Sequence, residues 1–159
     1  FSGARTQIQT KIELSHDSYF MGWEISCLGR PASDEYFSKG ELDQRFEVWR
    51  DGRPLRVERL WLKGDDPVLN EKWGLHGFPV IGSMVCVTDK TGLVESLRKK
   101  TNSSKDQELF SATQTDGIII CSFLGNSVER ARSYFIDVWK ILRQQVIGRE
   151  AVEPRIWKT

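Results

Sequence analysis

The stretch LDQRFEVW-RDGRP-LRVERLWL, residues 42–62, decides the fold class of this chain. Apolar and polar residues alternate on both sides of Asp51-Gly52, a dipeptide that favours the positive backbone angles of a tight hairpin turn. We therefore predict an antiparallel hairpin with strands over 42–49 and 55–62.

The residues on the amino-terminal side of this hairpin also have strand patterns. Residues 4–14 alternate with a period of two, which predicts a half-buried strand. Aromatic and β-branched residues over 19–28 predict a second strand that ends before Pro31. Residues 63–77 are rich in glycine, proline and acids and are interpreted as an ordered loop, whose predicted anchors are Leu69, Trp73 and Leu75.

The carboxyl-terminal half has a different pattern. Residues 79–88 predict a strand buried on both faces, and a short helix is expected to follow as far as about Lys100, with Leu93, Val94 and Leu97 on one side. A polar loop over 101–106 then leads to a strand pair at 108–113 and 118–124. A last helix is expected between an Asn126 cap and Gly148.

Together these elements predict one α+β, β-dominated domain over residues 1–159. Its β-rich part would span residues 1–77, and residues 78–159 would contribute the order strand, helix, strand, strand, helix.

Charge and hydropathy exclude two classes of partner. The 23 Lys and Arg residues nearly balance the 22 Asp and Glu residues, so the formal net charge is only +1. Such a chain has no overall field to attract nucleic acid or an anionic membrane. The longest uncharged apolar runs, 78–87 and 117–125, are much shorter than the roughly 20 residues of a spanning helix.

The cysteines and the first residues bear on the compartment. Cys27, Cys86 and Cys121 are odd in number, widely spaced and surrounded by apolar residues, which predicts reduced, buried thiols and a cytoplasmic protein. The opening residues 1–5 contain neither an initiating Met nor the pattern of a signal peptide. We therefore expect the chain to begin inside a longer one.

Few side chains have the spacing that catalysis or tight metal binding requires. His16 and His76 are sixty residues apart, and no cysteine lies at metal-ligand spacing from another cysteine or a histidine. Cys27 has Arg30 three residues further on, which would lower a thiol pKa, but we favour a packing role. We therefore predict no catalytic residue and no tightly bound cofactor.

Three charged residues in apolar runs leave alternatives open. Glu24 should lie on the face opposite Trp23 and Ile25, and we favour a solvated position for it. Glu58 and Arg59 should point to opposite faces, so each is a candidate buried charge that needs a partner on another strand.

Two tryptophans suggest a different function. Trp49 and Trp61 could share one face of the hairpin. With Glu24 and Glu58 as acids, they would make a carbohydrate-binding or hydrolytic β domain the main alternative.

Several blocks together resemble the UreD family of urease accessory proteins, also called UreH, over essentially the whole chain. They are WEISCLGRPA at 23–32 followed by Glu35, WRDGRPL at 49–55 followed by Glu58-Arg59, GLHGFPVIG at 74–82, LGNS at 124–127 and GREAVEPRIWKT at 148–159. Residues 1–5 resemble a mid-chain block of that family with Ser2 in place of proline. The resemblance thus implies that the amino-terminal part of the family domain is missing here and that the first strand has an unpaired edge.

The resemblance implies a non-enzymatic role in urease maturation. Such a protein is a scaffold and nickel-transfer partner for apo-urease, acting with UreF, the GTPase UreG and the urease structural subunits. The fold it implies consists of stacked, helically arranged β-sheets with two helices in the carboxyl-terminal half. Nickel would be bound only transiently, along a path of carboxylates, backbone and water, with ligands that no motif here identifies. A defective remnant of such a gene is a further alternative.

The family motifs also supply the predicted partner-binding positions, although each of them has a folding role as its alternative. These positions are Cys27, Leu28, Gly29, Arg30, Pro31, Glu35, Glu58, Arg59, Gly74, Gly77, Pro79, Gly82, Arg155, Ile156 and Trp157.

Overall fold

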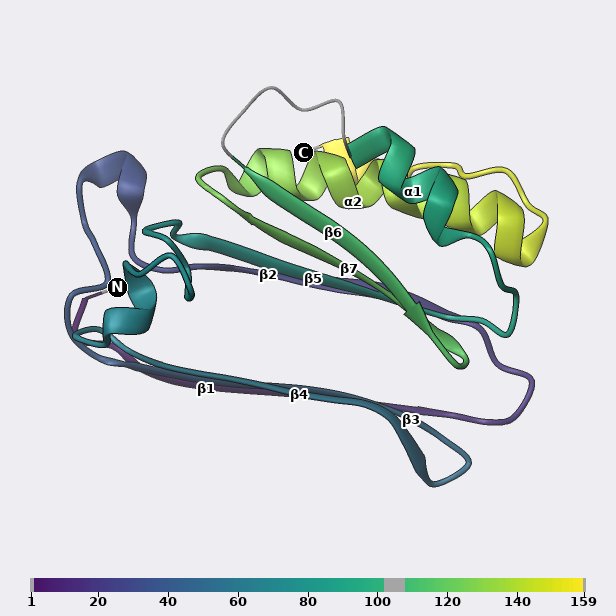
Figure 1. The fold of residues 1–159 in the computed structure, drawn as a ribbon, viewed down its shortest axis with the longest axis horizontal. Helices are drawn as coiled ribbons and strands as arrows, with labels where there is room; N and C mark the ends of the chain where they lie inside the picture. Colours follow the sequence, from purple (N-terminus) through teal and green to yellow (C-terminus); the bar gives the residue numbers. More distant parts are fainter. Residues whose placement is uncertain (1, 102–107, 159) are drawn as a thin grey trace.

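The computed structural model describes residues 2–101 and 108–158 and has three layers, with one sheet stacked on a second and helices over the second (Figure 1). The first sheet has the order β1-β3-β4, with β1 at Arg5–Leu14, β3 at Glu41–Arg50 and β4 at Arg53–Lys63. The second sheet has the order β2-β5-β7-β6, with β2 at Phe20–Cys27, β5 at Val80–Val87, β6 at Leu109–Thr115 and β7 at Ile118–Gly125. The helices are α1 at Val94–Thr101 and α2 at Val128–Leu142. The β-dominated α+β class is confirmed.

The predicted hairpin is present as β3 and β4. Asp51 and Gly52 have φ values of 48° and 74°, the positive angles that the Asp-Gly turn requires. A bulge between Val48 and Trp49 shifts the pairing near this turn. The strand β1 pairs with β3 in parallel, because the chain passes through β2 in the second sheet between them.

Apolar side chains fill the space between the two sheets near the hairpin turn. Phe46 and Val48 of β3 pack against Val85 and Val87 of β5 and against Ile118 of β7. The prediction of a strand buried on both faces is confirmed for β5, since its other face lies under α2.

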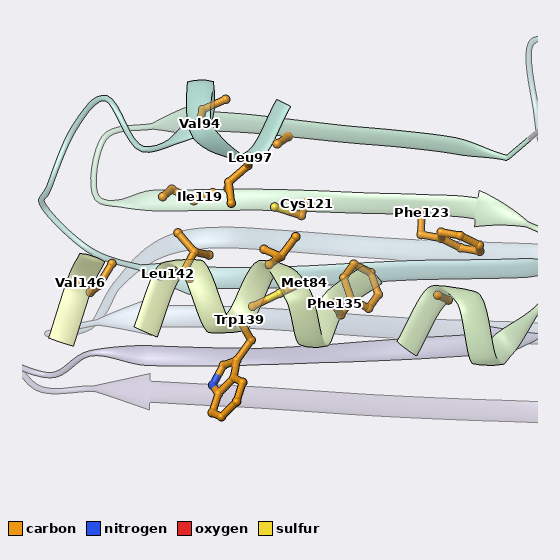
Figure 2. Close-up of a cluster of buried hydrophobic side chains, with 14 of the residues drawn as sticks. Met84, Val94, Leu97, Ile119, Cys121, Phe123, Phe135, Trp139, Leu142 and Val146 are labelled. Atoms are coloured by element: carbon orange, nitrogen blue, oxygen red, sulfur yellow. The ribbon is translucent and has the colours of Figure 1, made fainter. Parts of the chain in front are cut away.

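The largest core cluster lies between the second sheet and the helices (Figure 2). Phe135, Trp139 and Leu142 of α2 belong to this cluster, together with Met84 and Cys121 of the sheet.

The cysteines divide into two classes. Cys86 and Cys121 are buried in the core under the helices, and burial raises the pKa of each thiol to about 12. The buried-thiol prediction therefore holds for these two. It is wrong for Cys27, which is exposed at the end of β2.

The ends of the last helix match the prediction except at the cap. The hydroxyl of Ser127, not the side chain of Asn126, accepts a hydrogen bond of 3.2 Å from the Arg130 N–H. A π-helical turn at Arg143–Ile147 extends α2, and Gly148 closes it with a φ of 71°. Among the described residues, no helix has the length and apolar character needed to cross a membrane.

The loop before β5 is ordered, as predicted, but one predicted anchor is wrong. Asp66 accepts a hydrogen bond from Val68 N–H and starts a 3-10 turn, and Leu69 and Leu75 pack against a small cluster around Leu62. Trp73 is 73% exposed and anchors nothing. The polar loop is predicted over 101–106. Its first residue, Thr101, is instead the last residue of α1, and residues 102–106 lie outside the described residues.

Candidate functional site

A band of polar side chains crosses the space between the two sheets, perpendicular to the strands. On β3 and β5 the polar position lies between inward-facing apolar residues, which belong to one apolar cluster on each side of the band. We call this band the interlayer belt, and its members are Thr10, Glu24, Ser26, Gln44, Arg56, Glu58 and Ser83.

Glu24 is the acceptor at one end of the belt. The Gln44 amide donates to its Oε2 over 2.6 Å, and the Thr10 hydroxyl donates to its Oε1. The Ser26 hydroxyl donates to the Oε1 of Gln44 over 2.7 Å. Because Gln44 and Thr10 belong to the first sheet, these bonds join the two sheets.

Glu58 is the acceptor at the other end. Its Oε2 pairs with Nη2 of Arg56, and the Ser83 hydroxyl lies 3.2 Å from the same guanidinium and 3.3 Å from the carboxylate. The Arg56 side chain is only 13% exposed, and its Nε and Nη1 are buried without a hydrogen-bond partner in the part of the chain described here. A buried guanidinium with free donors attracts a further oxygen.

The two carboxylates line one small cavity between the sheets. The cavity has a volume of about 20 Å³, which is space for one water molecule. Glu24 and Glu58 carry two negative charges against the one positive charge of Arg56, so the belt offers oxygen ligands to a small cation or to water. The described residues contain no cluster of three or more His, Cys, Asp or Glu side chains that could enclose a metal ion.

The structure corrects the expectations for the acids. Glu24 does lie on the face opposite Trp23, as predicted, but it is half-buried and hydrogen-bonded, so the solvated position is wrong. Alternation places a residue on a face but does not show what covers that face.

Glu58 and Arg59 point to opposite faces, as predicted, yet neither is a buried charge. Their side chains are 39% and 59% exposed. Arg59 makes two hydrogen bonds of 2.9 and 3.0 Å to Asp43 on β3, which lower the pKa of that carboxyl. Glu47, in contrast, is a buried acid: it is 4% exposed, contacts Arg45 and accepts a hydrogen bond of 2.7 Å from Trp49.

Two of the family motifs meet at the loop end of the β-sheets. The Leu28 N–H donates to the Pro79 carbonyl over 2.8 Å, and Leu28, Gly77 and Pro79 help line a cavity of about 230 Å³. Arg30 and Glu35 close the neighbouring loop through a side-chain ion pair and a two-residue backbone bridge. This ion pair lowers the pKa of Glu35.

Two glycines of these motifs have a steric requirement. A Cβ on Gly29, whose φ is +82°, would lie 2.3 Å from the Glu35 carbonyl oxygen, and one on Gly74 would lie 2.1 Å from that of Val68. Only glycine fits at both positions.

Three other motif positions, Gly77, Pro31 and Cys27, have local structural roles or environments. Gly77 has a φ of +78°, and Pro31 begins a 3-10 turn. The pKa of the Cys27 thiol is raised by the burial of part of its side chain and is not lowered by Arg30.

The tail lies on the other face of the second sheet, away from the interlayer belt. The Trp157 ring is 5.2 Å from that of Trp23 and 5.1 Å from that of Trp139, and Arg132 donates to its carbonyl over 2.8 Å. Arg155 and Ile156, in contrast, are exposed. The structure therefore does not bring the tail together with the other predicted positions.

The alternative platform is not assembled. Trp49 and Trp61 do share the outward face of the first sheet, with Lys11 5.4 Å above one ring and Lys63 4.9 Å above the other. The two acids proposed to act with them, Glu24 and Glu58, face the interlayer belt on the other side of that sheet.

Sequence reasoning missed the other five members of the belt, which are Thr10, Ser26, Gln44, Arg56 and Ser83. The available signal was a polar residue at an inward position on each of several strands. Without the strand order, these positions could not be joined into one band.

Comparison with known proteins gives one consistent family. The model of the family described as UreD urease accessory protein matches residues 1–158. The urease accessory protein UreD of Alcanivorax borkumensis is 41% identical over 160 residues, which cover 100% of this chain and 54% of the relative. The urease accessory protein UreD of Dechloromonas aromatica is 41% identical over 164 residues, which cover 100% of this chain and 56% of the relative. The urease accessory protein UreD 2 of Brucella anthropi is 37% identical over 161 residues, which cover 100% of this chain and 58% of the relative. The chain thus spans little more than half the length of these curated relatives, and it belongs to the UreD family of urease accessory proteins.

Proposed function

We propose that this protein acts in urease maturation as a non-catalytic scaffold and nickel-transfer partner, which helps to load nickel into apo-urease in the cytoplasm. Its partners in this role are UreF, UreG and the urease structural subunits. Nickel is the cargo of this process and not a resident cofactor.

The interlayer belt is the observation that carries the proposal. A transfer protein must bind its cargo and release it, so weak oxygen ligands suit it better than a closed cage of imidazole and thiolate. Glu24 and Glu58 supply such oxygens around one cavity, and Arg56 keeps their net charge at −1. The rest of the lining consists of the hydroxyl groups of Ser26 and Ser83, the amide of Gln44, and the apolar side chains of Phe46, Leu60 and Ile81.

We assign the binding of partner proteins to the end of the sheets that carries these loops. The residues that flank the loop closed by Arg30 and Glu35 line the cavity of about 230 Å³ together with part of the segment at 74–82. Hydrogen bonds hold both the loop and the segment in place. Exposed Tyr36 and Trp73 are on the loops at this end, and aromatic side chains give large contact area at low entropic cost.

The test is activation of apo-urease in cells that lack the chromosomal gene and carry a variant of the complete protein. Glu24→Gln and Glu58→Gln keep the shape of each side chain and remove its charge. We expect each to lower nickel per urease and urease activity several-fold, without changing co-purification with UreF. Glu71→Gln, in an exposed loop, is the matched control and should behave like the parent protein.

Two results would contradict the proposal. Normal nickel content of urease in the Glu24→Gln/Glu58→Gln double variant would remove the belt from the transfer path. Full urease activation in cells that lack the gene altogether would remove the maturation role.

A further inference from the structure

Arg56 is the one positively charged member of the interlayer belt, and its guanidinium is only partly compensated. Its Nη2 pairs with the Glu58 carboxylate and lies 3.2 Å from the Ser83 hydroxyl oxygen. Its Nε and Nη1 are buried and have no hydrogen-bond partner among the described residues. Because the described residues already enclose these two atoms, polypeptide packed on the outside of the molecule does not reach them. The positive charge therefore stays between the sheets, next to the Glu58 carboxylate.

This charge acts on the small cavity between the sheets. Glu58 and Ser83, which both contact Arg56, line the cavity, and Glu24 lines it from β2. The cavity has a volume of about 20 Å³, so an ion inside it has no room for a hydration shell of its own. Charges that lie close together inside a protein interact more strongly than charges separated by bulk water. A cation in the cavity is therefore attracted by the two carboxylates and repelled by Arg56.

The sum of the charges shows what this repulsion does to a divalent cation. Two carboxylates and one guanidinium give the belt a net charge of −1, and a divalent cation brings it to +1. Without the guanidinium, the two carboxylates would give −2, and a divalent cation would make the site neutral. An uncompensated charge between the sheets costs free energy, so the complex that contains Arg56 is the less stable of the two.

We propose that Arg56 limits the affinity of the interlayer belt for divalent cations, so that a bound cation leaves again during transfer. This inference rests on the proposed function, in which the belt is the part of the protein that holds nickel. Arg56 is not a metal ligand, because a guanidinium has no acceptor atom. It acts through its charge and through its contacts with Glu58 and Ser83, and it is a positioning residue in this sense.

The test measures the binding of Ni²⁺ alone to the complete protein by equilibrium dialysis. Arg56→Gln removes the charge and keeps a polar side chain. Because the Glu58 side chain is 39% exposed, water screens part of the repulsion, and we expect this variant to bind Ni²⁺ about 10- to 30-fold more tightly than the parent protein. Arg56→Met removes the charge with a different side chain, and it should show the same gain and carries the test if Arg56→Gln does not fold.

The rate of release gives a second readout. Transfer of bound Ni²⁺ to an excess of a chromogenic chelator should be slower in Arg56→Gln by a similar factor, because the ion enters the same cavity but is held more tightly. In the cellular assay, nickel per urease should therefore fall in spite of the tighter binding. A variant that merely damaged the belt would bind Ni²⁺ more weakly.

Three controls separate the charge of Arg56 from its packing. Arg56→Lys keeps the positive charge and should bind Ni²⁺ nearly as weakly as the parent protein. Arg53→Gln removes a positive charge from an exposed position on the same strand and should leave the affinity unchanged. Adding Glu24→Gln and Glu58→Gln to Arg56→Gln removes the carboxylates that hold the ion, so the gain in affinity should disappear. Circular dichroism checks that each variant is folded.

The proposal is wrong if the folded variants without the charge bind Ni²⁺ no more tightly than the parent protein, or if the gain persists without the two carboxylates. It is equally wrong if neither the parent protein nor Arg56→Gln shows any binding that depends on Glu24 and Glu58. The transfer role fails on a different result, which is normal nickel loading of urease by the Glu24→Gln/Glu58→Gln double variant.

Discussion

Gly82 offers a sharp test of whether a family motif serves folding or docking. A Cβ at this position would lie 2.6 and 2.8 Å from Cε2 and Cζ of Phe135, whereas carbon atoms in contact prefer roughly 3.5–4.0 Å. Phe135 is completely buried and packs near Trp23 and Tyr134, so its ring has no free space to move into.

The expected cost of Gly82→Ala follows from two opposing terms. Overpacking a core costs about 1–3 kcal/mol, and replacing a strand glycine by alanine returns about 0.5–1 kcal/mol of chain entropy. We therefore expect a loss of about 1–2 kcal/mol in the free energy of unfolding, measured by urea titration with tryptophan fluorescence.

A double-mutant cycle isolates the steric term. Phe135→Leu alone should cost about 1–2 kcal/mol because it removes buried ring atoms. In that background Gly82→Ala should cost nothing, since the added methyl group fills the vacated space. Costs that add within about 0.5 kcal/mol would refute the steric explanation. A stable Gly82→Ala protein that fails to activate urease would assign the glycine to docking instead.

Three further predictions concern other parts of the molecule. Trp157→Ala should lower the free energy of unfolding by about 2 kcal/mol, because it removes two aromatic contacts, while Arg155→Ala should stay within about 0.5 kcal/mol of the parent in the same titration. The ion pair with Arg30 lowers the pKa of Glu35 below its usual 4.5. The pair therefore stabilises the folded protein above pH 4.5, and this stabilisation is lost as the pH falls through the lowered pKa. Arg30→Gln should make the melting temperature less dependent on pH in this acid range. In the folded protein a thiol reagent at pH 8 should label Cys27 alone, and all three cysteines after denaturation; labelling of the two core thiols in the native state would contradict the buried assignment.

The sequence predicted local structure well because local rules determine it. Asp51-Gly52 defined the hairpin, and Gly148 defined the end of α2. The cap was wrong by one residue because Asn126 and Ser127 are adjacent and both side chains can accept the same type of hydrogen bond.

The sequence pattern could not predict which residues of one sheet contact the other sheet. Whether Glu24 meets water or Gln44 depends on a contact between residues 20 positions apart in two different sheets. The same limit applies to Glu47, which occupies a nominally outward position but is buried beside Arg45 and Trp49. The candidate site is built almost entirely from such contacts, so only its individual acids could be named in advance.

The directionality of hydrogen bonds gives the interlayer belt a structural consequence. Two apolar surfaces can slide over each other with little change in energy, because dispersion contacts have no preferred direction. A displacement of one residue along β2 would turn Glu24 away from Thr10 and Gln44 and bring Ile25 in its place. The polar groups thereby restrict the two sheets to a single alignment, and the shape that the molecule presents to other proteins is held constant from the inside.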